Sequence, residues 1–282
     1  MRIGCAVGAS LLVVAVFVAI GAVAFTARTV LKHLDQITAS SSSSPNDPNV
    51  QPPTLKIVVQ QPKVATYAGP PRRQGFDVSY PQCGKTLPST KQGFAIVGIA
   101  GGAPLTRNKC RAAQWSWAQQ QSGAAVYVNT SDPAKKDAAT WGKEIGASAL
   151  FGISTTGVPK GTPVWLDVET ENTWNGSWSR HVTVLQTMAQ TIADGGYPVG
   201  IYSNANLWYI ITGNATVNVP IWYATGPGRK DRALAFCGSE GFGGKNPSIV
   251  QWVQKSEKGY LLDHNAFCPG VAGTGVVART GN

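Results

Sequence analysis

Residues 163–169 read PVWLDVE, a short apolar run that ends in two acids. Val and Trp favour β-strands, and a run that is apolar on both faces is typical of a strand buried in a parallel sheet. Asp is disfavoured in strands, so the acids that close this run are conspicuous. The stretch therefore predicts a buried strand that carries Asp167 and Glu169 to one end of a sheet.

Seven further runs of this kind recur along the chain. They lie at residues 75–78, 94–99, 124–128, 198–203, 219–224, 248–253 and 261–267. Helical patterns separate several of them, at 108–121, from Asp132-Pro133 to about 148, and at 179–193. Strands that alternate with helices indicate a parallel sheet. We therefore predict an α/β fold, a compact (β/α)8 TIM-like barrel. The alternative is an open doubly wound sheet, although no G-x-G-x-x-G loop follows the first strand.

The composition is that of a folded domain with little charge. Hydrophobic residues make up 43% of the 282 residues, and charged residues only 13%, about half the usual share of roughly 25%. Lys and Arg number 24 against 14 Asp and Glu, a formal charge of +10. No block of five or six like charges occurs, so we expect no nucleic acid as a partner. Nine Trp residues and low charge also exclude a coiled coil and a disordered polyelectrolyte.

The N-terminal part of the chain predicts export. Residues 3–25 are uncharged and long enough to cross a bilayer as a helix, while Ala22-Val23-Ala24 has the form of a signal cleavage site. We expect residues 1–28 to be a transmembrane anchor, which we favour, or a cleaved signal segment. Residues 29–74 are rich in Ser and Pro and predict a flexible linker. Residues 75–282 would then form the barrel domain, held at the outer face of the membrane or secreted.

Four cysteines lie in the predicted domain, and they allow three disulfide pairings. Proximity in sequence favours Cys83 with Cys110 and Cys237 with Cys268. Four free buried thiols are the alternative, which an oxidising compartment disfavours. No C-x-x-C motif occurs and the three histidines are scattered, so we expect neither a metal site nor a cofactor.

The acidic side chains gather at the ends of the predicted strands. Asp167 and Glu169 share one face of a strand, about 6.6 Å apart. Closure of a barrel would also bring Asp263, on the last strand, beside Asp77 on the first. Each acid alone could be a solvated strand end, a turn cap or a Ca²⁺ ligand. Together at the barrel mouth they predict glycoside hydrolysis, in which a protonated carboxyl donates and a carboxylate supports the positively charged centre.

Aromatic side chains lie in or just after several of the predicted strands. Flat aromatic faces suit the C–H faces of sugar rings, although each ring singly could belong to the core. We take four of them as candidate substrate-binding residues, namely Tyr80, Tyr202, Trp222 and Trp252.

Six short motifs carry a resemblance to a known family. FDVSYPQ, VWLDVET, VGIYSN, PIWYA, VQW and LDHNAF resemble, in this order, the strand motifs of the family 25 glycoside hydrolases, which are lysozymes of the N-acetylmuramidase type. The chain is also similar to actinobacterial glycoside-hydrolase-like proteins. The resemblance implies a compact barrel that cleaves peptidoglycan after N-acetylmuramic acid. It further implies that Glu169 is the general acid, and that Asp167 orients the substrate acetamido group or stabilises the charged intermediate.

The resemblance assigns supporting roles as well. Asp77 and Asp263 would shape the mouth and tune the acid pair, while Tyr202 and Trp252 would line sugar subsites. The second strand departs from the family, because residues 97–104 read VGIAGGAP where polar residues with Lys and Glu are usual. Two alternatives follow, an inactive barrel that binds wall polysaccharide and a glycosidase that cleaves another wall polymer, such as arabinan or galactan.

Overall fold

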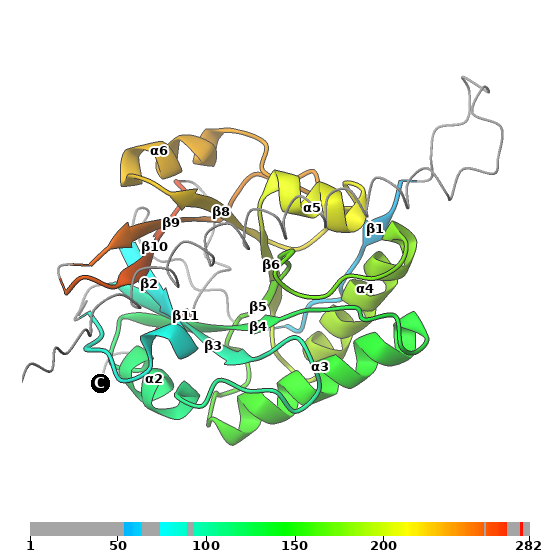
Figure 1. Ribbon diagram of the computed structural model, residues 1–282, viewed down its shortest axis with the longest axis horizontal. Helices are drawn as coiled ribbons and strands as arrows, with labels where there is room; N and C mark the ends of the chain where they lie inside the picture. Colours follow the sequence, from blue (N-terminus) through cyan, green and yellow to red (C-terminus); the bar gives the residue numbers. More distant parts are fainter. Residues whose placement is uncertain (1–53, 64–73, 89–92, 257, 270–276, 279–282) are drawn as a thin grey trace, which may run out of the picture. The chain divides into compact units, whose positions relative to one another are not determined.

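Eight strands close into a barrel in the computed structural model (Figure 1), which describes residues 54–63, 74–88, 93–256, 258–269 and 277–278. In order around the barrel they are β2 (Gln74–Val78), β3 (Phe94–Ala100), β4 (Gly123–Asn129), β5 (Val164–Asp167), β6 (Val199–Ser203), β8 (Ile221–Pro227), β9 (Ile249–Lys255) and β10 (Leu261–Phe267). The last strand, β10, pairs with the first, β2. Each strand coincides, to within a few residues, with a run predicted from the sequence, so the eight-stranded barrel is confirmed.

The barrel departs from a regular (β/α)8 pattern where it closes. β10 runs antiparallel to both β9 and β2, and only a short loop joins β9 to β10. Such a loop permits a hairpin but not a helical crossover to a parallel strand. Helices follow five of the strands in the described residues, namely α2 (Arg111–Ala118), α3 (Ala138–Thr155), α4 (Trp178–Asp194), α5 (Ala205–Thr212) and α6 (Lys230–Ala235). The prediction of a full (β/α)8 barrel is therefore corrected at its last strand.

Alternation along the strands divides the apolar core into two layers. Inside the barrel lie Phe94, Ile96, Ala125, Trp165, Tyr202, Trp222, Ala224, Ile249 and Phe267. The larger outer layer lies between the strands and the helices, where α3 and α4 pack side by side (Figure 1). Gly142 of α3 permits this close approach, because a Cβ there would lie 2.5 Å from the Val184 carbonyl oxygen of α4.

The helix predicted to begin at Asp132-Pro133 begins later, at Ala138. Its N-cap is Asp137, whose side chain accepts a hydrogen bond of 2.9 Å from the backbone nitrogen of Thr140. Asp132 is instead buried and forms an ion pair of 2.8 Å with Arg180 of α4. The loop after β4 is thereby tied to a helix that lies much later in the chain.

A short segment inside the predicted linker belongs to the fold. β1 (Lys56–Ile57) pairs in parallel with β7 (Thr216–Val217). Ile57 is fully buried, and Gln186 of α4 exchanges two hydrogen bonds of 2.6 Å with the backbone of Val58. The expected flexible linker therefore does not extend over residues 54–63.

Both disulfides join the cysteines that proximity in sequence favours. Cys83 pairs with Cys110, and Cys237 pairs with Cys268, across Cα separations of 5.7 and 5.2 Å. The first fastens the turn after β2 to the start of α2, and the second fastens the segment after α6 to the end of β10. The predicted pairing is confirmed.

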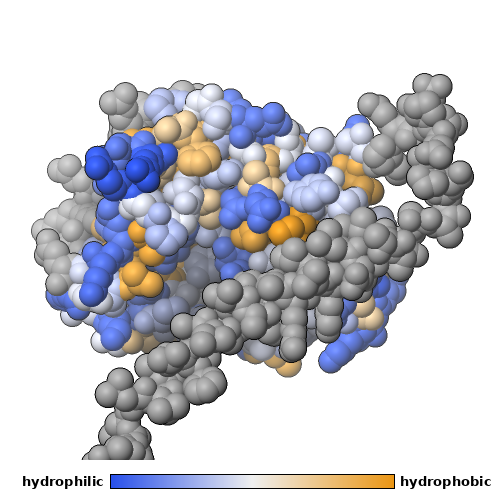
Figure 2. Space-filling model, turned by 45° about the horizontal axis from the view of Figure 1, so that its top comes forward, coloured by the Kyte–Doolittle hydropathy of each residue, from blue (hydrophilic) through white to orange (hydrophobic). Residues whose placement is uncertain are grey.

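The residues that the structure describes include no helix long and apolar enough to cross a membrane. The predicted span at residues 3–25 lies outside the described residues, as does most of the predicted linker. On the face shown in Figure 2, hydrophilic and apolar patches alternate. Scattered apolar side chains of this kind are ordinary for the surface of a folded domain.

Candidate active site

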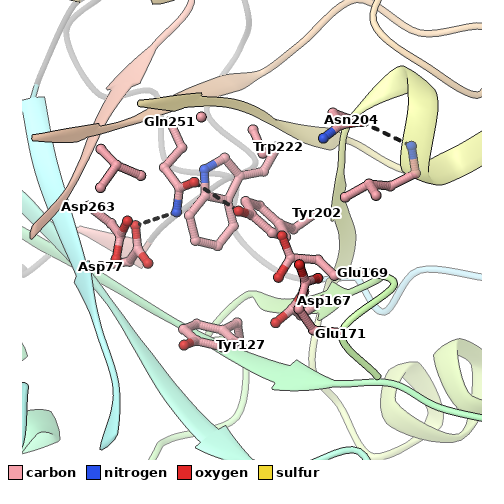
Figure 3. A pocket seen from close by; sticks show the side chains of 14 residues that line it. Asp77, Tyr127, Asp167, Glu169, Glu171, Tyr202, Asn204, Trp222, Gln251 and Asp263 are labelled. Carbon is pink, nitrogen blue, oxygen red and sulfur yellow. Dashed lines mark hydrogen bonds between the residues drawn. The ribbon is translucent and has the colours of Figure 1, made fainter. Parts of the chain in front are cut away.

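A cleft of about 410 Å³ lies at the end of the barrel where the parallel strands terminate (Figure 3). Five carboxyl side chains line it, those of Asp77, Asp167, Glu169, Glu171 and Asp263. The other lining residues named here are Tyr127, Tyr202, Asn204, Trp222 and Gln251. Among the described residues, no lysine, arginine or histidine lines the cleft. The structure thus brings all four predicted acids to one place.

Asp77 and Asp263 face each other across neighbouring strands. They form a direct cross-strand pair, because β10 runs antiparallel and so presents its early residues at the mouth of the barrel. Burial raises the pKa of Asp77 well above its usual range, and the charge of Asp263 raises it further. Burial also raises the pKa of Asp263, to about 6. This pair therefore retains protons at a pH where ordinary aspartates have lost them.

Asp167 ends β5, and Glu169 follows two residues later. Asp167 is only 6% exposed, and its Oδ1 atom has no hydrogen-bond partner among the described residues. Burial raises the pKa of Asp167 well above its usual range, and the neighbouring charge of Glu169 adds to the shift. Burial likewise raises the pKa of Glu169 to about 7, reinforced by the charge of Glu171. Glu169 therefore still holds a proton near neutral pH.

Glu171 is a cleft residue that the sequence reasoning missed. It continues the spacing of two residues that relates Asp167 to Glu169, and this repetition was the available signal. Glu171 is exposed, whereas Asp167 is buried. Despite the number of acids, no group of three or more His, Cys, Asp or Glu in the described part of the chain could hold a metal ion.

Two amide side chains, also missed, connect the acids to the aromatic wall of the cleft. Gln251 donates from Nε2 to Asp77 Oδ2 at 2.9 Å, and its Oε1 accepts from the Tyr202 hydroxyl at 2.8 Å. Asn265 donates from Nδ2 to the same Asp77 oxygen at 2.7 Å, and its Oδ1 accepts from Trp222 Nε1 at 2.8 Å. Polar residues at inward positions of buried strands were the signal for both amides.

The four predicted aromatic residues take different places. Tyr202 and Trp222 line the cleft, although Trp222 is only 1% exposed. Tyr80 is 71% exposed, follows β2 and is outside the cleft lining. Trp252 lies in the outer layer, 1% exposed, and stacks on His264 with ring centroids 5.4 Å apart. The prediction of Trp252 as a sugar platform is wrong, because strand alternation turns it away from Gln251 and the cleft.

Known proteins similar to this chain are lysozymes. A family model described as Lysozyme-like protein 1 matches residues 85–252, a range that includes Asp167 and Glu169 but neither Asp77 nor Asp263. A curated relative, the probable GH family 25 lysozyme 3 of Dictyostelium discoideum, is 32% identical over 119 residues. That match covers 39% of this chain and 23% of the relative, so the aligned part spans less than a quarter of the relative's length.

Solved structures similar to this chain include a lysozyme and a muramidase. The bacterial lysozyme from Streptomyces coelicolor superposes with a TM-score of 0.50 at 17% sequence identity, over 71% of this chain and 93% of that one. A muramidase from Trichobolus zukalii has a TM-score of 0.49 at 19% identity, over 71% and 95% of the two chains. Together with the family match, the Streptomyces structure confirms the resemblance drawn from the strand motifs.

Proposed function

Because the chain belongs to the Lysozyme-like protein 1 family, we propose that it is a glycoside hydrolase that cleaves cell-wall glycan, with peptidoglycan as its substrate. One observation carries the proposal, the convergence of four strand-end acids on a single cleft. Hydrolysis of a glycosidic bond needs one carboxyl that still holds its proton and a second that supports positive charge. A cleft lined by five carboxyl groups supplies both kinds of group.

Glu169 is the proposed general acid. Its pKa of about 7 keeps a large part of it protonated at neutral pH, which suits donation of a proton to the leaving glycosidic oxygen. As that bond breaks, positive charge develops at the anomeric carbon of the sugar. The Coulomb repulsion between Asp167 and Glu169 couples their titrations, so Asp167 ionises most readily while Glu169 still holds its proton.

Asp167 is proposed to orient the substrate. Its Oδ1 atom lies buried at the cleft without a hydrogen-bond partner among the described residues. A buried carboxyl oxygen without a partner is costly, and the N–H of a 2-acetamido group would satisfy it. Asp77 and Asp263 shape the opposite wall, and Tyr202 presents an aromatic ring at the same cleft.

We also propose that the barrel domain works outside the cytoplasm, anchored by residues 1–28 or secreted after their removal. The two disulfides support this location, because structural disulfides persist in oxidising compartments and are rare in the cytosol.

The test is the release of reducing ends from purified peptidoglycan by the full chain. Glu169→Gln removes the proton donor and keeps the shape, so we expect hydrolysis to fall by about 10²-fold or more. Glu240→Gln, at an exposed position outside the cleft, is the matched control and should keep full activity. Thermal unfolding of each variant reports whether the fold is intact.

Three outcomes would contradict the proposal. Full activity of Glu169→Gln would remove Glu169 from its role. Binding to the wall without product at any pH from about 4 to 8 would favour an inactive, polysaccharide-binding barrel. Release of arabinan or galactan fragments from whole cell wall, identified by their masses, would assign a different polymer.

A further inference from the structure

An open hollow of about 460 Å³ lies between α6 and the end of β9. Figure 1 shows α6 next to β8 and β9, and α6 packs against β9. The side chains that line the hollow are mostly charged or polar, namely those of Arg229, Lys230, Asp231, Leu234 and Gln254. The hollow therefore differs from the cleft, because it contains cations.

The hollow and the cleft lie side by side, because the same two strands supply both. Gly226 of β8 and Val253 of β9 line the cleft. Arg229 follows Gly226 by three residues and Gln254 follows Val253 directly, and both of these later residues line the hollow. The Gly228 backbone nitrogen donates to the Val253 carbonyl oxygen at 3.2 Å, which holds the two segments together. A ligand that leaves the cleft on this side would therefore meet the hollow.

Lys255 extends the cleft face of β9 toward solvent. Gln251 and Val253 line the cleft, and alternation along the strand puts Lys255 on the same face, about 6.6 Å beyond Val253. Val253 pairs across the ladder with Asp263, one of the cleft acids. Lys255 is exposed at the end of the strand. Its ammonium group is therefore the first cation along β9 beyond the acids.

Five cations gather on α6, on the residue before it and on the hairpin from β9 to β10. We call them the basic rim, namely Arg229, Lys230, Arg232, Lys255 and Lys258. Within the described part of the chain, the only ion pair of the basic rim joins Arg229 to Asp231, at 3.0 Å and largely exposed. Glu257 lies outside the described residues. Charge is thus divided at the site, with acids inside the cleft and cations along one edge.

The proposed substrate divides its charge in the same way. The sugars of peptidoglycan are uncharged, whereas each N-acetylmuramic acid carries a short peptide, the stem, with free carboxylates. The described lining of the cleft offers a carboxylate no cation, and its five acids oppose further negative charge. The basic rim attracts such a group, because complementary charge favours its approach.

We propose that the basic rim binds the carboxylates of the peptide stem while the glycan occupies the cleft. The inference rests on the proposed function and names its substrate class, which is peptidoglycan that still carries its stems. A stem suits this position better than a separate anionic polymer does. It is bonded to a sugar in the cleft, so it has to leave the cleft across an edge.

The test compares cleavage of three soluble substrates by the full chain. They are glycan that carries its stems, the same glycan after an amidase has removed them, and stem-bearing glycan whose carboxylates are converted to neutral methylamides. At low salt the first should have the highest kcat/KM. Lys230→Met/Lys255→Met removes two charges of the basic rim and should lower this preference about fivefold, because an exposed ion pair changes binding about two- to threefold. Salt should weaken the preference as well.

Lys143→Met, at an exposed position of α3 outside both linings, is the matched control and should keep the native preference. Thermal unfolding of each variant reports whether the fold is intact. An unchanged preference in Lys230→Met/Lys255→Met would overturn the proposal. Equal cleavage of the three substrates, together with inhibition by a phosphate-bearing wall polymer that contains no peptide, would assign the basic rim to a separate polymer and overturn it too.

Binding measurements separate this inference from the proposed function. Glu169→Gln lacks the proposed proton donor, and it should bind stem-bearing glycan more tightly than bare glycan. Addition of Lys230→Met/Lys255→Met should reduce that difference about fivefold. A chain that bound in this way but released no reducing ends would refute the proposed function alone. A chain that cleaved glycan equally well with and without stems would refute this inference alone.

Discussion

The ion pair between Asp132 and Arg180 predicts an asymmetric loss of stability. The Asp132 side chain is fully buried, whereas that of Arg180 is 22% exposed. Arg180 contacts Asp132 through Nε at 2.8 Å and through Nη2 at 2.9 Å. The pair holds the loop in which Thr130 donates two hydrogen bonds to the backbone oxygen of Asp167. Loss of this ion pair should therefore disturb the cleft as well as lower the stability of the fold.

Substitution of either partner leaves the other one unpaired, and the two unpaired groups should differ in their cost to stability. Arg180→Met leaves a carboxylate without exposure and without its counter-charge, which costs about 4 kcal/mol. Asp132→Asn keeps an oxygen that can accept from the Ala134 backbone nitrogen, now at 2.9 Å. The partly exposed Arg180 keeps its hydrogen bond of 2.7 Å to the Lys136 carbonyl oxygen and can turn its other donors to water. Asp132→Asn should therefore cost only about 2 kcal/mol.

Urea denaturation followed by tryptophan fluorescence measures both losses as changes in the free energy of unfolding. Lys136→Met breaks the exposed pair with Glu144 and serves as the control, at a cost below about 1 kcal/mol. Equal losses for Arg180→Met and Asp132→Asn, or the reverse order, would refute the reasoning from burial.

Three further predictions concern the acids and the outer tryptophan. Glu171→Gln removes a charge that raises the pKa of Glu169, so the alkaline limb of the pH profile of hydrolysis should move to lower pH. The expected shift is about half a pH unit at low salt, the effect of one charge about 7 Å away in a solvent-like dielectric. Because folding raises the pKa values of Glu169 and Asp263 to about 7 and about 6, their contribution to stability is complete at low pH and is lost as the pH rises through those values. Urea titrations from pH 5 to 8 should therefore show falling stability, with a smaller fall in Asp263→Asn. Trp252→Phe should lower the melting temperature and leave hydrolysis of peptidoglycan unchanged. Loss of activity without loss of stability would instead show that Trp252 binds sugar.

The strands and the four acids were predictable because both signals are local. Short apolar runs show the strands directly, and acids at their ends stand out in a chain where only 13% of residues are charged. Closure of a barrel brings the strand of Asp263 beside that of Asp77, and the antiparallel course of β10 then places the two acids opposite each other.

Long-range pairings were not predictable in the same way. Asp132 has the local signature of a helix start, but Arg180, 48 residues later, draws it into a buried ion pair. Residues 56–57 gain their strand partner from residues 216–217. At β9 the alternation was available, yet the preference for an aromatic ring selected Trp252 over its inward neighbour Gln251.

The closing hairpin also bears on the order of folding. The Asn265 amide meets Asp77 across 188 residues of sequence, and both strands that supply Gln251 and Asp263 come late in the chain. Contacts of such separation form after the local ones, because a long loop must close first. During synthesis, β2 emerges well before its partner strand β10. The cleft is therefore assembled only when the final hairpin docks, so partly folded chains lack the complete set of acids.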